Sequence, residues 1–322
     1  MLTRRSALTI MGFGLSLTAT ARAEDYPAKP VRIIVPYSPG AGNDNLSRLT
    51  GDYLSKRLGQ RFFVENKPGA GSEIGCDFVA KANPDGYTIM WSASDGISLL
   101  PAVKHDLPYR VPEDFTFIAM VTDFTELISV NADLPIKTLQ DLIDYAKANP
   151  GKLRYGTAGV GGAPHLATVL FAQKAQIEMV HVPFGGVAPA LTAVAGGHID
   201  LALASPQASK PFTDSGRVRP LAIADDKRHK FYPDVPTTAE AGIPGLVVTF
   251  WAGIMGPAGL PEPIVARLEK EIETMLGDPD IVARLDQLGY VSVYMGSRAF
   301  RDFVVADLSK WRDTARSANI SL

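Results

Sequence analysis

The sequence of 322 residues has almost no cysteine, and Cys76 is its single example. No internal disulfide can therefore form, and Cys76 stands too far from the N-terminus to carry a lipid after removal of a leader. We interpret Cys76 as a small buried residue. Histidine is also scarce and lacks the spacing of a metal site; the five histidines are His105, His165, His181, His198 and His229.

Motifs of three common enzyme classes are missing. There is no Gly-x-Ser-x-Gly elbow and no phosphate-binding loop that ends in Gly-Lys-Ser or Gly-Lys-Thr, and the first glycine-rich turn is not Gly-x-Gly-x-x-Gly. An excess of basic charge is missing too, since the formal net charge is −2. A mildly acidic chain is a poor partner for nucleic acid or for an anionic membrane surface.

Long apolar runs are missing beyond the first 23 residues. Within these residues, Arg4 and Arg5 precede an apolar run over 7–20, and Ala21-Arg22-Ala23 has the small-x-small form of a signal-peptidase site. Because the run is shorter than the ~20 residues of a spanning helix, we predict a cleaved signal peptide over 1–23 rather than a membrane anchor. The Sec and twin-arginine routes both stay open. The mature protein is expected to be soluble and periplasmic.

The mature chain of about 300 residues suggests two domains, at ~150 residues each. Short apolar runs predict strands over 31–35, 61–65 and 88–91, and helical patterns fall at 44–58 and after residue 72. Strands separated by helices predict a parallel sheet. The long, extended and apolar stretch 115–130 is the expected crossing into a second domain.

The second half repeats this pattern. Strands are predicted over 153–156, 179–182, 199–204 and 219–224, with helices opened by a capping box at 138–141, by Pro164 and at 187–195. A strand over 247–255 is expected to rejoin the first sheet, and amphipathic helices follow it. We therefore assign residues 24–124 plus 227–322 to domain 1 and residues 125–226 to domain 2.

Four turns of glycine and other small residues follow predicted strands, at 37–43, 92–96, 157–163 and 183–186. Glycine lets the backbone approach a guest, and a helix start offers unpaired N–H groups and a positive dipole. In open parallel sheets ligands gather at the carboxyl ends of the strands. Each turn alone is explained by loop geometry, but together they predict one cleft. Because no turn contains Lys or Arg, the expected ligand is a carboxylate held by the backbone.

The sequence resembles the periplasmic solute receptors of tripartite tricarboxylate transporters, the TctC or Bug-type family. The motifs that carry the resemblance are Tyr26 to Pro36 followed by Tyr37-Ser38-Pro39-Gly40, Glu65 to Gly71, Pro84 to Thr88, Leu153 to Gly156, Pro164-His165-Leu166, Pro233 to Thr237 and Glu240-Ala241-Gly242. They cover the whole mature chain and are specific when taken together. Ala41 departs from the more common Pro-Gly-Gly form of the first turn, and 160–163 replaces a loop richer in hydroxyl groups.

The resemblance implies an α/β protein with a two-domain periplasmic-binding-protein fold, of the Venus flytrap, type II-like class, and a ligand cleft between the domains. It implies a receptor without catalysis or cofactor that binds a di- or tricarboxylate, an aromatic acid or an acidic amino acid, and delivers it as a monomer to a membrane permease. By motif match the ligand-binding residues would be Tyr37, Ser38, Gly40, Ala41, Gly42, Asn43 and Asp44 in the first turn, and Thr157, Ala158, Gly159 and Gly162 in the third. Further contacts are expected from Ser92, Ala93, Ser94, His165, Gly185, Gly186 and Ser205.

Several residues keep two interpretations. Asp44 would bond a ligand or cap its own helix, with capping favoured; His165 would touch a ligand or serve its helix; and Trp251 would wall the cleft or lie buried. Two other function classes also stay open. One is a ligand sensor for a signalling partner, and the other is an exported hydrolase that would use a pair such as Ser94 and His165.

Overall fold

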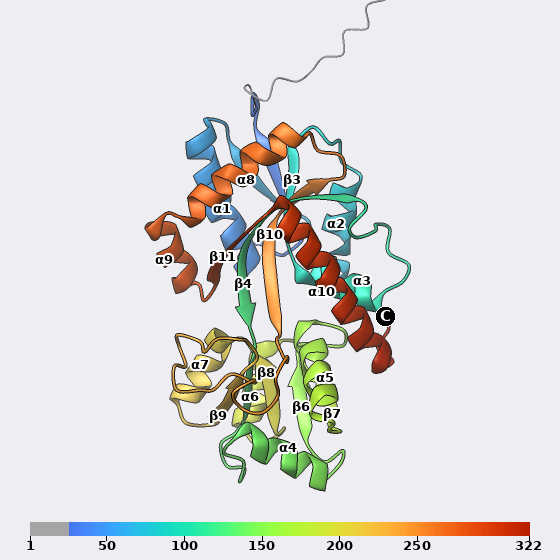
Figure 1. The fold of residues 1–322 in the computed structure, drawn as a ribbon, viewed down its shortest axis with the longest axis vertical. Helices are drawn as coiled ribbons and strands as arrows, with labels where there is room; N and C mark the ends of the chain where they lie inside the picture. The colour runs from blue at the N-terminus through green and yellow to red at the C-terminus, as the bar shows by residue number, and fades with distance from the viewer. Residues whose placement is uncertain (1–25) are drawn as a thin grey trace, which may run out of the picture.

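The structure, a computed structural model, describes residues 26–322. The predicted signal peptide and its cleavage site lie outside the described residues. The chain forms two lobes stacked along the longest axis, each built around its own β-sheet (Figure 1). This is a two-domain α/β fold, as predicted. Between residues 26 and 322, no helix has both the length and the apolar character that a membrane span requires.

The first lobe contains a six-stranded sheet with the order β11-β4-β10-β3-β1-β2. Its strands are β1 (Val31–Val35), β2 (Phe62–Asn66), β3 (Thr88–Ala93), β4 (Phe115–Thr125), β10 (Thr249–Pro257) and β11 (Val291–Gly296). Strand β1 runs parallel to β2 and β3, whereas β10 is antiparallel to β3 and β4 and β11 is antiparallel to β4. The parallel arrangement predicted for the first three strands is therefore confirmed, and the sheet as a whole is mixed because β4, β10 and β11 pair antiparallel.

Helices cover both faces of this sheet (Figure 1). They are α1 (Gly42–Leu58), α2 (Glu73–Ala80), α3 (Leu100–Val103), α8 (Glu262–Leu276), α9 (Pro279–Gln287) and α10 (Ser297–Ser317), with short helical turns at Ala70–Ser72 and Asp95–Leu99. The aromatic stripe of α10 packs into the core, where Phe300 and Trp311 are fully buried. Trp251 is buried as well and donates its indole N–H to Asp307 at 3.0 Å. Burial, the safer interpretation of both features, is confirmed.

The second lobe contains a five-stranded sheet with the order β7-β6-β8-β5-β9. Its elements are β5 (Leu127–Asn131), α4 (Leu139–Ala148), β6 (Arg154–Thr157), α5 (Ala163–Ala175), β7 (Val180–Pro183), α6 (Val187–Ala195), β8 (Leu201–Ala204), α7 (Pro206–Asp214) and β9 (Val218–Ile223). The predicted capping box is confirmed, since the Thr138 hydroxyl accepts from the Asp141 N–H and the Asp141 carboxylate accepts from the Thr138 N–H.

Two strand connections join the lobes. Strand β4 of the first sheet continues through Glu126 into β5 of the second sheet. After β9, residues 225–248 pack on the second lobe, where Tyr232 contacts the buried pair Leu127 and Ile223. The chain then returns as β10. The Thr125 hydroxyl lies between both connections and contacts the carbonyl oxygens of Ala224 (2.9 Å) and Val248 (3.2 Å).

One local prediction was wrong, and two elements were not predicted. The turn expected at 92–96 is not a turn at its start, because Ser92 and Ala93 belong to β3 and are buried. Strand β11 was not predicted, because it lies at the sheet edge and only a partner strand more than 160 residues away defines it. Helix α7 was also not predicted, since Pro206 opens it and Pro211 lies inside it.

Candidate functional site

A cavity of about 410 Å³ lies between the two lobes. This size falls within the usual range for small-molecule sites. Its walls come from the carboxyl ends of β1, β2 and β3 in the first lobe and of β6 in the second. The lining residues are Pro36, Tyr37, Ser38, Pro68, Gly69, Gly71, Ser72, Asp95, Leu99, Leu100, Val160, Gly161, Gly162 and Leu322. Three of the four predicted turns therefore meet at one cavity, and Asp95 is the charged side chain in its lining.

The first turn ends in an exposed helix start. Gly40 has φ +81°, a left-handed conformation that favours glycine and turns the chain into α1. The first bond into the helix runs from the Asn45 N–H to the Ala41 carbonyl at 3.0 Å. Ahead of this bond, the N–H groups of Gly42, Asn43 and Asp44 have no acceptor within hydrogen-bonding distance among residues 26–322. These are the donors that an anion at a helix start would use.

Asp44 holds this turn in place instead of capping the helix. The N-cap residue is Ala41, which makes no side-chain cap. The Asp44 carboxylate is buried and accepts from the Gly40 N–H at 2.8 Å, from Asn66 Nδ2 at 2.8 Å, and from Arg48 Nε and Nη2 at 3.0 and 2.9 Å. The favoured interpretation as a helix cap was therefore wrong in detail. All four bonds favour the charged form, so although burial opposes it, the pKa of Asp44 is lowered.

The same network reaches the start of the turn. Asn66, at the end of β2, also donates Nδ2 to the Tyr37 carbonyl at 3.0 Å, and its Oδ1 accepts from Arg48 Nη2 at 3.1 Å. Arg48 is thus the basic residue that stands near the first turn, and its charge is already paired with Asp44. The positive potential at the helix start comes mainly from the backbone.

Tyr290 is a neighbour of the first turn that the sequence did not reveal. A Cβ built on Gly42 would lie 2.2 Å from the Tyr290 hydroxyl oxygen, so this hydroxyl sits directly against the start of α1. A side chain at position 42 would displace it. The side chain of Asn43 is engaged elsewhere, because its Oδ1 accepts from the Trp91 indole at 3.1 Å. Burial and the negative charge of Asp95 raise the pKa of Tyr290, so its hydroxyl remains a donor at neutral pH.

The turn of the second lobe is held by stacked imidazoles. His165, in the first turn of α5, accepts the Gly161 N–H with Nδ1 at 3.0 Å, which places its proton on Nε2. The His181 ring lies parallel to it with the centroids 4.0 Å apart, and His181 Nε2 lies 2.6 Å from the Thr157 hydroxyl. Burial and the neighbouring imidazole lower the pKa of His165 to about 4, and burial lowers that of His181. Both rings are therefore neutral at pH 7.

The acid in the cavity, Asp95, follows β3. Its Oδ2 lies 3.5 Å from the Tyr37 hydroxyl, and burial raises its pKa. A ligand carboxylate would be repelled by an ionised Asp95, so it must lie toward the helix starts. A ligand hydroxyl, an ammonium group or water is the suitable neighbour for Asp95 itself.

Of the predicted ligand-binding residues, Tyr37, Ser38 and Gly162 line the cavity. The other residues of the first and third turns stand behind this lining; they are Gly40, Ala41, Gly42, Asn43, Asp44, Thr157, Ala158, Gly159 and His165. Ser92, Ala93 and Ser94 are almost fully buried within and just after β3. Gly185 and Gly186 form the turn before α6, and Ser205 caps α7 by accepting from the Ala208 N–H.

The turn Pro68–Ser72 after β2 also lines the cavity, although it is not one of the four predicted turns. Its signal was visible, since Gly69 and Gly71 follow a predicted strand as the other glycines do.

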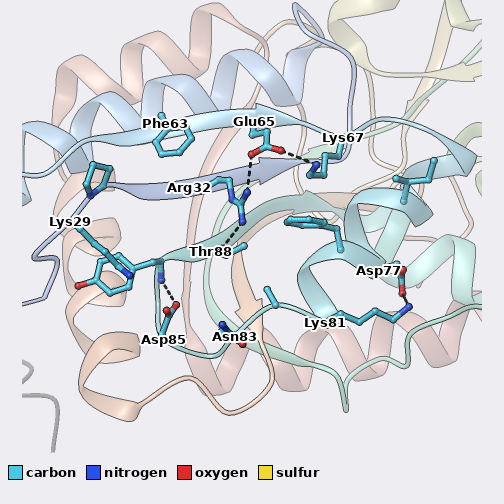
Figure 2. Close-up of a pocket in the computed structure, with 15 residues that line it drawn as sticks. Lys29, Arg32, Phe63, Glu65, Lys67, Asp77, Lys81, Asn83, Asp85 and Thr88 are labelled. Atoms are coloured by element: carbon cyan, nitrogen blue, oxygen red, sulfur yellow. Dashed lines mark hydrogen bonds and ion pairs between the residues drawn. The ribbon is translucent and has the colours of Figure 1, made fainter. Parts of the chain in front are cut away.

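A larger hollow of about 950 Å³ lies on the outer face of the first lobe, but most of its charges are already paired (Figure 2). Glu65 accepts from both Arg32 (3.2 Å) and Lys67 (2.8 Å), and Lys81 pairs with Asp77 (2.6 Å). The lining comes from the first lobe alone. We therefore favour the cavity between the lobes as the functional site. Within the described chain, no group of three His, Cys, Asp or Glu side chains could hold a metal ion.

Comparisons with known proteins show the family of the chain. Residues 46–320 match the profile of the tripartite tricarboxylate transporter family receptor. The chain is 33% identical over 308 residues to the UPF0065 protein in the tcbD-tcbE intergenic region of Pseudomonas sp. (strain P51), covering 94% of this chain and 91% of that protein.

Two solved structures with a named ligand are similar over nearly their whole length. One is R. palustris Rpa4515 with adipate, with a TM-score of 0.77 and 32% identity over 92% of this chain and 99% of the other. The other is MatC (Rpa3494) from Rhodopseudomonas palustris with bound malate, with a TM-score of 0.73 and 31% identity over 90% and 99%.

Proposed function

Since the chain belongs to the family of tripartite tricarboxylate transporter receptors, we propose that it binds a small organic carboxylate in the cavity between its lobes and delivers it to a membrane permease. Members of this family are periplasmic receptors rather than enzymes. The observation that carries the proposal is the meeting of the turns before α1 and α5 at one cavity whose lining contains no Lys or Arg.

The unpaired backbone donors are the proposed carboxylate contacts. Gly42, Asn43 and Asp44 offer three N–H groups at the start of α1, and the Tyr290 hydroxyl stands beside them. Across the cavity, the N–H groups of Gly162 and Ala163 also have no acceptor among residues 26–322. A hydrogen bond to a charged group contributes about 1.5–3 kcal/mol, and a micromolar complex needs about 8 kcal/mol after association costs. Contacts from both lobes are therefore needed together.

Closure of the lobes would bring the two sets of donors to the ligand. We propose domain 1 for the first lobe and domain 2 for the second, with the outward crossing at Thr125 as predicted and the return crossing moved from 227 to Val248. This later position is supported by the packing of residues 225–248 on the second lobe. A ligand shifts such an equilibrium only by its higher affinity for the closed state.

The relatives suggest which carboxylates to test first. Rpa4515 was solved with adipate and MatC with malate, so an aliphatic dicarboxylate is our first candidate class. Thermal unfolding of the mature protein with adipate, malate, citrate, benzoate and glutamate should show stabilisation by at least one of them, because a ligand that binds only the native state raises the melting temperature. If none of the five raises it, the proposal is wrong.

A matched pair of variants locates the site. Gly162 and Gly185 both follow strands of the second lobe, and a Cβ at either position would meet open space. Gly162 lines the cavity and Gly185 does not. Gly162→Glu should abolish binding, since it places a carboxylate among the anion donors, whereas Gly185→Glu should leave affinity unchanged. The reverse result would move the site to the turn before α6.

A further inference from the structure

A second hollow of about 810 Å³ lies on the surface beside the end of α10. One wall is α3 with the loop that follows it, and the other is the last part of α10 with residues 319–321. Figure 1 shows α3 and this loop running beside the lower half of α10. The lining residues are Pro101, Ala102, Lys104, His105, Leu107, Tyr109, Arg110, Val111, Glu113, Arg312, Arg316, Asn319, Ile320 and Ser321.

The charges around this hollow are strongly unequal. Four cationic side chains, Lys104, Arg110, Arg312 and Arg316, line it together with His105, against the single carboxylate of Glu113. Partners outside the lining neutralise two of the cations, since Lys104 pairs with Glu73 at 2.6 Å and Arg110 with Asp114 at 3.0 Å.

The two arginines of α10 remain available. Arg316 lies 3.5 Å from Asp313, but both side chains are at least 70% exposed, so solvent screens this pair. Arg312 is exposed and has no carboxylate within 4.0 Å in the described part of the chain. They stand one helical turn apart, which points both guanidinium groups along the same side of α10.

The outer hollow of Figure 2 provides the contrast. There three of the four cations are paired with Glu65 and Asp77, and Arg32 and Lys67 also lie over the Phe78 ring, 5.0 and 4.3 Å from its centroid. The fourth cation, Lys29, lies over the Tyr87 ring at 4.2 Å. In the hollow beside α10, Arg312 has neither a carboxylate nor an aromatic ring as partner in the described part of the chain, and apolar groups form part of the lining, among them Leu107, Val111 and Ile320.

The position of this hollow links it to the ligand cavity. Leu99 and Leu100 line the cavity, and the next residues, Pro101 and Ala102, line the hollow. On the other side, Ser321 lines the hollow and Leu322 lines the cavity. The two spaces thus share a thin wall of α3 and residues 320–322.

The end of α10 also contacts the second lobe. Gln173 of α5 donates Nε2 to the Thr314 carbonyl at 3.1 Å and to the Ser317 hydroxyl at 2.7 Å. A partner bound beside α10 would contact a helix of the first lobe whose end is hydrogen-bonded to α5. Its binding would therefore depend on the relative position of the two lobes.

We propose that this hollow is the docking surface for the membrane permease, and that it receives an extracytoplasmic segment that carries several carboxylates beside one or two apolar side chains. The proposal rests on the proposed transport function. The exposed guanidinium groups of Arg312 and Arg316 favour an acidic segment, and the apolar lining fixes its register.

The direct test uses a defined peptide. The probe is an end-blocked, fluorescent hexapeptide of four glutamates, one leucine and one phenylalanine, and the reference is its analogue with glutamine for glutamate. Fluorescence anisotropy at low salt should show saturable binding of the acidic peptide only, and added salt should weaken it because the charges are exposed. Equal binding of both peptides, or binding of neither, would overturn the proposal.

Variants identify the surface. Arg312→Glu combined with Arg316→Glu should reduce peptide affinity about tenfold or more, because attraction becomes repulsion. Arg298→Glu is the matched control, since Arg298 is an exposed arginine in the first turn of the same helix, and it should leave affinity unchanged. Amide chemical-shift changes on peptide addition should map to 101–113 and 312–321. An equal loss in both variants, or shifts located elsewhere, would contradict the docking surface.

The same variants separate this proposal from the proposed function. The double variant should keep the wild-type thermal shift with the carboxylate that the mature protein binds, because neither arginine lines the cavity. If the wild-type protein binds no carboxylate, the proposed function is wrong. If it binds a carboxylate but not the acidic peptide, only the docking surface is wrong.

Discussion

The turn before α1 and the turn before α5 both line the same cavity, yet they are held by opposite chemistry. In the first lobe, a buried carboxylate, Asp44, collects four hydrogen bonds, two of them from a charged guanidinium. In the second lobe, the neutral imidazole of His165 accepts one backbone N–H and stacks on His181. The first turn therefore depends on the charged form of Asp44, and the second depends on the neutral form of His165.

This difference gives the two turns different sensitivities to acid. The pKa of Asp44 is lowered in the folded state, so its contribution to stability is fully present above the unfolded value near ~3.9 and is lost only as the pH falls through the lower folded value. The pKa of His165 is lowered to about 4 from an unfolded value near 6.5, so the unfolded state binds the proton first. Stability from the second turn is therefore lost progressively between pH 6.5 and 4, where the first turn is unaffected.

The largest effect is expected from Asp44→Asn. This substitution keeps the side-chain shape but removes the charge that Arg48 and the Gly40 N–H recognise, so unfolding at pH 7 should become easier by about 1–3 kcal/mol. Carboxylate affinity should fall as well, because the turn loses its support. Asp52→Asn, an exposed aspartate on the same helix, is the control for denaturant unfolding and should change stability little. Equal stability of wild type and Asp44→Asn would show that the charge of Asp44 does not stabilise the first turn.

His165→Asn tests the turn before α5, which is held by a neutral imidazole. The asparagine carbonyl can replace Nδ1 as acceptor for the Gly161 N–H, but it does not titrate. The wild type should lose on the order of 2 kcal/mol of stability between pH 6.5 and 4, and the variant should lose less, because one protonation linked to unfolding is gone. Melting temperatures across this pH range measure the slope, with the exposed His198→Asn as control. A slope that His165→Asn leaves unchanged would exclude this imidazole as the source.

Asp95→Asn should change binding rather than stability. Removing a negative charge from the cavity lining should raise the affinity for a simple dicarboxylate such as adipate roughly fivefold at pH 7, because like-charge repulsion is removed. Calorimetric titration at pH 7 and at pH 5 provides the measurement. The advantage of the variant should shrink as the pH is lowered, since the raised pKa of Asp95 means that its carboxylate is protonated at a higher pH than an ordinary aspartate. Weaker adipate binding by the variant at pH 7 would contradict this repulsion.

The smallest effect on stability is expected from adding one methyl group to each turn. Gly40 has φ +81° and Gly162 has φ −77°, and a Cβ at either position meets open space. Gly40→Ala should therefore cost about 1 kcal/mol in backbone strain alone, whereas Gly162→Ala should be neutral or slightly stabilising. Denaturant midpoints of the two variants measure this difference. Equal midpoints would indicate that the first turn can relax its left-handed residue.

Local patterns were sufficient for most elements of the fold. The strand at 31–35, the helix at 187–195 and the capping box at Thr138 each follow from a few neighbouring residues, and all three are confirmed. What failed was set at long range or by atypical residues. Ser92 and Ala93 look like a turn by composition, but they form the end of a central strand because β10 pairs with them.

The site shows the same division. The turns at 37–43 and 157–163 were predictable because glycine after a strand marks a close backbone approach. Tyr290 was not, since it meets Gly42 from a position almost 250 residues later in the chain. The support for each turn was also hidden in part. The four-residue spacing of Asp44 and Arg48 predicts their contact on one helix. Asn66 reaches Asp44, and His181 reaches His165, only because the strands that carry them pair in the sheets.

The order of the strands has a consequence for how the protein folds during synthesis. All five strands of the second sheet come from the continuous segment 127–223, so this lobe can complete its core as soon as that segment is available. In the first sheet, both neighbours of β4 are β10 and β11, which are made after the whole second lobe. The lobe that begins the chain must therefore finish last, with one side of β4 unpaired until residue 296 has been made, and long-range pairing of this kind forms slowly.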